Sequence, residues 1–99
     1  MNMQKLMMEA QKMQAKLQKE QAELESSSYE GISSLVKVVI NGKKEVISVK
    51  INMDDDISRD DVEMLEDMIM LAMNDAVKKA DADKEKRLGK YGQGLTGLM

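Results

Sequence analysis

The sequence predicts an α+β fold in which a long N-terminal helix, a small antiparallel sheet and a C-terminal helix follow one another. The central observation is residues 35–51, where two runs of β-branched residues are joined at Asn41-Gly42. A segment with heptad spacing precedes this stretch, at residues 2–25, and an acidic, methionine-rich segment follows it, at residues 58–87. This order, in only 99 residues, is typical of a small obligate dimer rather than a self-sufficient enzyme.

The N-terminal helix is predicted by apolar residues that recur at steps of three and four. They are Met3, Leu6, Ala10, Met13, Leu17 and Leu24, and the repeat is broken only at Glu20. On an ideal helical wheel they fall within about 80° of arc, which is the narrow seam of a coiled coil. A rod of roughly 35 Å is too long to be buried on a subunit of this size, so we expect the seam to pack against another helix.

The sheet is predicted to have two or three strands. Three serines at 26–28 end the helix, and residues 29–33 form a short first strand, with Gly31 at a bend or bulge. Asn41-Gly42 suits a tight type I′ turn, in which both residues have positive φ. Alternation places Val36, Val38 and Ile40 on one face, and Ile47, Val49 and Ile51 on one face of the next strand. Such a sheet is marginal alone, and its edges are expected to pair with a second copy.

The C-terminal helix is predicted to begin after an acidic turn at 54–56, with Ser58 as N-cap and acids in its first turn. Its main apolar face comprises Val62, Leu65, Ile69, Ala72, Met73, Ala76 and Ala80, and a second face comprises Met64, Met68 and Leu71. We therefore expect the sheet to cover one side and a partner subunit the other. The helix continues or kinks into a piece at about 78–88. Residues 1–88 form one dimerising domain, and the glycine-rich residues 89–99 a flexible tail.

Composition excludes several classes of function. With no His and no Cys, there is no catalysis by either, no disulfide and no good metal set. Residues 92–97 match G-x-G-x-x-G, but only two residues follow, so no helix can receive a pyrophosphate. Residues 54–65 resemble a calcium loop, yet Arg59 and Leu65 stand where Gly and Glu are required. We expect no enzyme activity, no cofactor and no small-molecule substrate.

Hydropathy indicates a cytoplasmic protein. No run approaches the roughly 18 apolar residues of a membrane span, so we expect no membrane partner. The first residues also lack the apolar region of a signal peptide.

Charge is distributed unevenly around a net value of −3. Residues 53–83 carry −8 and residues 84–99 carry +3. Four lysines of the N-terminal helix fall within about 60° of arc, turned away from the apolar seam, and a second basic stripe forms if the C-terminal helix runs far enough. The two sets are Lys5, Lys12, Lys16 and Lys19, and Lys79, Lys86, Arg87 and Lys90. They either grip a phosphate backbone or are solvated lysines, partly neutralised by i,i+4 pairs with Glu9, Glu20 and Glu23.

The whole chain resembles the YbaB/EbfC family of bacterial nucleoid-associated DNA-binding proteins. The matching stretches are MMEAQKMQAKL at 7–17, LVKVVING at 35–42, VISVKI at 46–51, MLEDMIMLAMNDAVKK at 64–79 and the final GLTGLM. Two departures concern the segment before LVKV, which is Gly-Ile-Ser-Ser here, and the tail, which lacks proline.

The resemblance implies a tweezer-like homodimer of α-β-β-β-α subunits that binds double-stranded DNA between helical arms. It also implies a role in chromosome organisation or transcription modulation at the nucleoid. The two basic sets above would supply mainly phosphate contacts, because no base-reading element is identifiable. Candidates for the dimer interface are Met3, Leu6, Met13, Leu17, Leu65, Met68, Ile69 and Met73. The alternative is a small acidic adaptor or chaperone module that uses its helices and sheet edge to bind a polypeptide.

Overall fold

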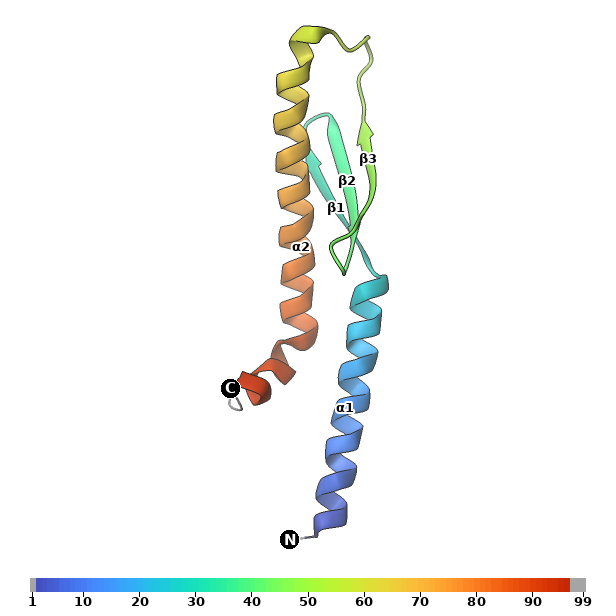
Figure 1. The fold of residues 1–99 in the computed structure, drawn as a ribbon, viewed down its shortest axis with the longest axis vertical. Coiled ribbons are helices and arrows are strands. Elements are labelled where there is room, and N and C mark those ends of the chain that lie inside the picture. Colours follow the sequence, from blue (N-terminus) through green and yellow to red (C-terminus); the bar gives the residue numbers. More distant parts are fainter. Residues whose placement is uncertain (1, 97–99) are drawn as a thin grey trace.

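The computed structural model describes the backbone of residues 2–96 and the side chains of residues 2–89 and 91. In chain order its elements are α1 (Met3–Ser26), β1 (Ser28–Ser33), β2 (Val36–Asn41), β3 (Val46–Ile51), the 3-10 turn η1 (Arg59–Asp61) and α2 (Val62–Thr96). This confirms the predicted α-β-β-β-α order. The molecule is a rod of 71 × 22 × 14 Å, in which α1 and the C-terminal part of α2 extend from the sheet in the same direction (Figure 1).

We call the sheet and the part of α2 packed on it the body, and α1 and the C-terminal part of α2 the arms (Figure 1). Helix α1 projects from the body along most of its length. Its N-terminus is capped by Asn2, whose side chain accepts a hydrogen bond from the Gln4 N–H. At its C-terminus the hydroxyls of Ser26 and Ser27 both donate to the carbonyl of Glu23, which satisfies a carbonyl that the helix leaves open. Only Leu24, in the last turn, is buried.

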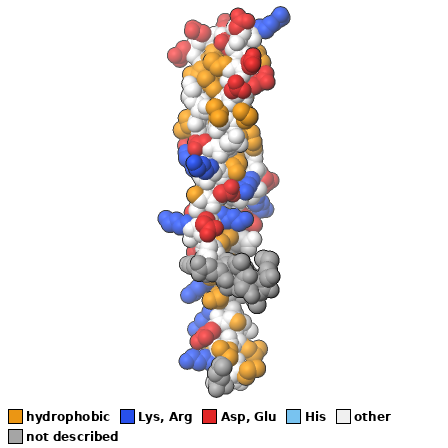
Figure 2. All heavy atoms as spheres, turned by 90° about the vertical axis from the view of Figure 1, so that its left-hand side faces the viewer, with side chains coloured by type: hydrophobic (Ala, Val, Ile, Leu, Met, Phe, Trp, Pro, Cys, Tyr) orange, Lys and Arg blue, Asp and Glu red, His pale blue; other side chains and the backbone are white. Residues whose placement is uncertain are grey.

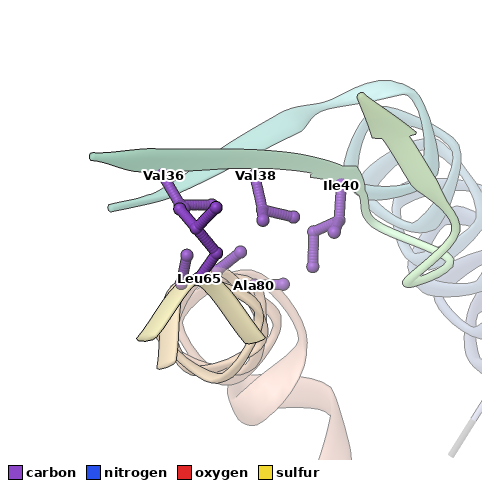
Figure 3. Close-up of a cluster of buried hydrophobic side chains, with 7 residues drawn as sticks. Val36, Val38, Ile40, Leu65 and Ala80 are labelled. Atoms are coloured by element: carbon purple, nitrogen blue, oxygen red, sulfur yellow. The ribbon is translucent and has the colours of Figure 1, made fainter. Parts of the chain in front are cut away.

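The core lies between β2 and α2. The antiparallel sheet has the order β1-β2-β3, and Val36, Val38 and Ile40 of β2 are buried as alternation predicted. They point toward α2, where Leu65 and Ala80 lie opposite them (Figure 3). Alanines on α2 allow the sheet to approach closely, because they hold no side chain beyond Cβ. The members of this core are therefore few and small.

Gly31 is where β1 comes nearest to α2. A Cβ at this position would lie 1.8 Å from the Ala72 carbonyl oxygen and 2.9 Å from the Ala76 Cβ. Gly31 sits inside β1, paired with Val38, so the expected bend or bulge does not form there. Its role is close packing of strand on helix.

Strand β3 forms an uncovered edge of the sheet. Val49 pairs with Val38, yet Val49 is 47% exposed because α2 packs on β1 and β2. A bulge interrupts the predicted alternation, so that Val46 rather than Ile47 lies opposite Ile40. Ile47 is 56% exposed.

The β2–β3 turn differs from the type I′ turn that Asn41-Gly42 predicts. Gly42 does not have positive φ, whereas Lys44 does, at 65°. The Asn41 side chain accepts hydrogen bonds from the N–H groups of Lys43 and Glu45, and this favours a three-residue loop that ends in a left-handed residue. Gly42 is required for another reason: a Cβ there would lie 1.8 Å from the Leu24 carbonyl oxygen.

Helix α2 is preceded by the predicted serine cap. Ser58 is the N-cap of η1, and its N–H donates to the Asp61 carboxylate at 2.9 Å. From Val62 the helix runs without interruption to Thr96, so the piece expected at 78–88 is part of α2, and the backbone at 89–96 is helical. The chain bends in the last turns of α2 (Figure 1). Residues 97–99 of the predicted tail lie outside the described residues.

Candidate nucleic-acid interface

The lysines of α1 form the least neutralised basic surface of the projecting arm. Lys5, Lys12, Lys16 and Lys19 are all exposed. In the described part of the chain none of the four forms an ion pair, although i,i+4 pairs with glutamates were expected. We call these four residues the lysine stripe.

Two of the three glutamates expected to neutralise the lysine stripe, Glu20 and Glu23, bind Arg87 instead. Its Nη1 lies 3.5 Å from Glu20 Oε2 and 3.1 Å from Glu23 Oε2, and its Nε lies 2.9 Å from Asp83 Oδ2. The Tyr29 hydroxyl donates to the same Asp83 oxygen. This cluster, the Arg87 clamp, joins α1, β1 and α2 where the two helices separate from the body.

The hydrogen bonds of the Arg87 clamp favour the charged forms of Asp83 and Arg87 and the neutral form of Tyr29. The Tyr29 hydroxyl, and then Arg87, lower the pKa of Asp83 below its ordinary value of 3.8. Asp83 in turn raises the pKa of Arg87. The pKa of Tyr29 is raised, first by desolvation and then by its hydrogen bond to Asp83. At neutral pH Asp83 and Arg87 therefore carry opposite charges, and Tyr29 is a neutral phenol.

Lys79 is also engaged within the subunit. Its Nζ lies 3.2 Å from Asp75 Oδ2 and donates to the carbonyl oxygen of Glu30 at 2.8 Å. Asp75 accepts the N–H of Ile32, and this bond is the main reason why the pKa of Asp75 is lowered. Two side chains of α2 thus satisfy outward backbone groups of β1 and cap that edge of the sheet.

The remaining members of the predicted C-terminal stripe lie further along α2. Lys86 is exposed and forms no ion pair with any described residue. The side chain of Lys90 lies outside the described residues. A hollow of about 450 Å³ between the arms is lined by Glu9, Lys12, Met13, Lys16 and Tyr91, so α1 lysines lie beside the end of α2.

Charge is segregated along the rod. Figure 2 shows acidic side chains gathered at the end that carries η1, and lysines and arginines spread over the half that carries the arms. The polarity follows the sequence, since residues 54–67 hold eight acids and one base. An anionic polymer is therefore repelled by the body and attracted to the arms.

The comparisons with known proteins agree with this surface. A family model described as the YbaB/EbfC DNA-binding family matches residues 1–95. The chain belongs to the YbaB/EbfC DNA-binding family. A nucleoid-associated protein of Staphylococcus carnosus is 51% identical over 95% of this chain and 90% of its own length. The nucleoid-associated protein GK0018 of Geobacillus kaustophilus is 48% identical over 95% of this chain and 88% of its own.

A third relative is matched over a shorter stretch. A nucleoid-associated protein of Finegoldia magna is 52% identical over 61 residues, which are 61% of this chain and 52% of that protein. Membership of the YbaB/EbfC family confirms the resemblance inferred from the sequence motifs, and this family is non-enzymatic, as predicted. In the described residues no helix is long and apolar enough to span a membrane, and no cluster of acidic side chains is arranged to hold a metal ion.

The candidate residues for a dimer interface fall into two groups. Met3, Leu6 and Met13 on α1 are 72%, 46% and 61% exposed, and Leu17 is half-buried. On α2, Leu65 is 6% exposed and fills the core of its own subunit. Met68, Ile69 and Met73 are half-buried and pack against that core. The α1 members therefore offer more surface to a second chain than the α2 members do.

Sequence reasoning missed the Arg87 clamp, although part of it was readable. Asp83 and Arg87 stand at i,i+4, a spacing at which opposite charges pair on one helix. Their contacts with Glu20 and Tyr29 span 67 and 54 residues of sequence, and no local pattern marks them.

Proposed function

We propose that the protein binds duplex DNA as a homodimer, mainly through phosphate contacts from the lysine stripe, and thereby organises the nucleoid or modulates transcription. The observation that carries the proposal is that the lysine stripe, on a projecting helix, forms no ion pair with any residue that the structure describes. A cation without an acidic partner binds phosphate without first breaking an ion pair. The names of the relatives, nucleoid-associated proteins, support the same function and a place at the bacterial nucleoid.

The homodimer supplies more contacts than one arm can. Four lysines per subunit give eight in a dimer. With about six to ten phosphate contacts, counterion release lowers the affinity by a factor of about 10³–10⁵ between 50 and 200 mM salt, so binding should depend steeply on salt. We propose that the exposed α1 seam of Met3, Leu6 and Met13 closes this dimer. Apolar seams of this width normally pack against another helix.

In this proposal Arg87 positions the two helices and does not itself contact DNA. Its guanidinium is held by three carboxylates, which fixes α1 against α2. By binding Glu20 and Glu23 it also keeps their charges away from Lys16 and Lys19. Lys86 and Lys90 remain candidates for contact from the second arm.

The test is fluorescence anisotropy of a labelled duplex of ~20 bp, titrated with the protein at ~50 and ~200 mM salt. We expect affinity to fall by at least about tenfold over this range. The variant Lys12→Glu/Lys16→Glu should lower the slope of log K against log salt by up to about four in a dimer, because roughly 0.9 unit is lost per phosphate contact.

The matched control changes the same charge on the body. Arg59→Glu/Lys78→Glu replaces two exposed cations that form no ion pair in the described part of the chain. This variant should bind within about threefold of wild type if the arms make the contacts. Equal losses in both variants would show that net charge alone governs binding, and would contradict a contact surface on α1.

A second candidate function rests on a different observation. Met3, Met7, Met8 and Met13 are 57–72% exposed on α1, and flexible methionine surfaces bind polypeptides. Under this alternative the protein is an adaptor or chaperone. No binding of duplex at either salt concentration, by protein shown to be a folded dimer, would remove the DNA proposal and favour the adaptor.

A further inference from the structure

A second basic site lies at the base of the arms, apart from the lysine stripe. A hollow of about 240 Å³ is lined by Gln21, Leu24 and Glu25 of α1, Gly42, Lys43 and Lys44 of the β2–β3 turn, and Lys84 and Leu88 of α2. Three segments that are distant in sequence thus line one concave surface, and two of them, the turn and α2, supply its three lysines. None of these lysines belongs to the predicted basic stripes.

The hollow is held in shape by the contacts of the β2–β3 turn. Gly42 lies directly against the end of α1, where the Leu24 carbonyl leaves no room for a Cβ. On the other side, Lys44 Nζ lies 2.7 Å from Asp81 Oδ1 of α2. Inside the turn, the Asn41 side chain accepts two backbone N–H groups. The turn is therefore fixed to both helices, and the backbone position of Lys43 is set before any ligand arrives.

The charge of the hollow is only partly compensated. Lys44 is paired with Asp81, but Lys43 and Lys84 are exposed and form no ion pair with any residue that the structure describes. One acid, Glu25, lines the hollow against three lysines. Two unpaired cations from separate elements repel each other unless an anion lies between them.

We propose that this hollow binds one phosphate group of a nucleic-acid backbone, at a site separate from the lysine stripe. Its volume lies below the roughly 300–1,000 Å³ of sites that enclose drug-sized ligands, so it suits a single phosphate rather than a nucleotide. Lysine recognises phosphate as a point charge, which needs proximity and no fixed fork geometry. The proposal rests on the function proposed above.

The geometry of α1 makes the two sites independent. At 100° per residue on an ideal helix, Gln21, Leu24 and Glu25 point about 110–170° away from the mean direction of the lysine stripe. A duplex lying straight along the stripe does not reach the hollow. The hollow therefore receives backbone that wraps around the base of the arm, or the backbone of another duplex segment.

The test uses ¹H–¹⁵N spectra of the full chain with an unlabelled duplex of ~20 bp. The amide signals of Gly42 and Lys43 should shift on titration in the wild type. They should also shift in Lys12→Glu/Lys16→Glu at duplex concentrations high enough to compensate for its weaker affinity. In Lys43→Gln/Lys84→Gln the Gly42 signal should not shift, and anisotropy should show a loss of roughly three- to tenfold in affinity.

The control is Arg59→Gln/Lys78→Gln, which removes the same charge from the body. It should keep the shift of the Gly42 signal, and the unchanged remainder of each spectrum reports that the variant is folded.

If Gly42 and Lys43 do not respond to duplex in a wild type that binds it, the hollow is not a phosphate site and the stripe proposal stands. If inorganic phosphate shifts these signals and duplex does not, a site for free anions replaces the backbone assignment. If wild type binds no duplex, both proposals are wrong.

Discussion

Two glycines set how closely the parts of this protein can approach, and each does so without an unusual φ. Gly31 lets β1 contact the backbone of α2, and Gly42 lets the β2–β3 turn contact the end of α1. Neither role is visible in the sequence, where the same residues predict a bulge and a type I′ turn. The sequence shows that a glycine is present, but whether a turn or a neighbouring backbone requires it depends on contacts between distant segments.

Replacing Gly31 by alanine should destabilise the fold, because the new Cβ would overlap backbone atoms of α2 that cannot move alone. We expect the free energy of unfolding to fall by at least about 1–3 kcal/mol, the usual cost of overpacking a core. Urea denaturation of both proteins at one concentration measures this loss.

Gly89→Ala is the matched control for this prediction. Among the described residues its Cβ would meet the flexible side chain of Glu85, and alanine favours a helix over glycine by about 1 kcal/mol. It should be neutral or stabilising. A Gly31→Ala variant as stable as Gly89→Ala would mean that β1 and α2 do not pack as closely as described.

Among the elements, the helices and the buried strand could be predicted from the sequence and the joints between them could not. Val36, Val38 and Ile40 alternate in a short window, so their shared buried face follows from local pattern. The Arg87 clamp unites residues from α1, β1 and α2, and depends on where those elements meet. We expect its loss to leave each helix intact and to alter the angle and stiffness of the junction between them.

The Arg87 clamp predicts a dependence of stability on pH. The pKa of Asp83 is lowered in the folded protein, so its contribution is present above the ordinary pKa of 3.8 and is lost as pH falls through and below that value. Wild type should therefore lose stability between pH 5 and pH 3, as followed by urea denaturation at about four pH values. Asp83→Asn should show a smaller loss over this range.

Asp55→Asn supplies the comparison, since Asp55 is exposed in the loop before η1 and forms no ion pair with a described residue. Its profile should run parallel to that of wild type. Identical profiles for Asp83→Asn and Asp55→Asn would show that the clamp does not contribute to acid stability.

For the whole molecule, the distribution of exposed apolar surface matters more than the core. Among the described residues the buried core cluster has seven members, three of them alanines, while large apolar side chains on α1 are exposed. A rod of 71 Å with so thin a core is poorly stabilised as a single chain. The length of the apolar seam on α1 predicts from the sequence that a partner is needed. The contacts that cover the seam involve residues of another molecule, so the sequence pattern of one chain does not identify them.

The variant Met13→Glu tests the α1 seam as the dimer contact. Met13 is 61% exposed in the single subunit, so the change should leave the subunit folded. In a closed seam it would bury two unpaired carboxylates, and we expect the dissociation constant from sedimentation equilibrium to rise by more than about tenfold. Gln11→Glu places the same charge on another side of α1 and should leave dimerisation unchanged. If both variants associate like wild type, the dimer is closed elsewhere.

The capped edge of β1 limits how large any assembly can become. Asp75 and Lys79 occupy backbone groups on that side of the sheet, whereas β3 carries no such cover within the described residues. A further strand can therefore add at β3 but not at β1. If two subunits pair through their β3 strands, the two outer edges of the shared sheet are both capped β1 strands. Growth into a fibre through these sheets stops at two copies. Crowding at high protein concentration therefore cannot turn the protein into a sheet aggregate by this route.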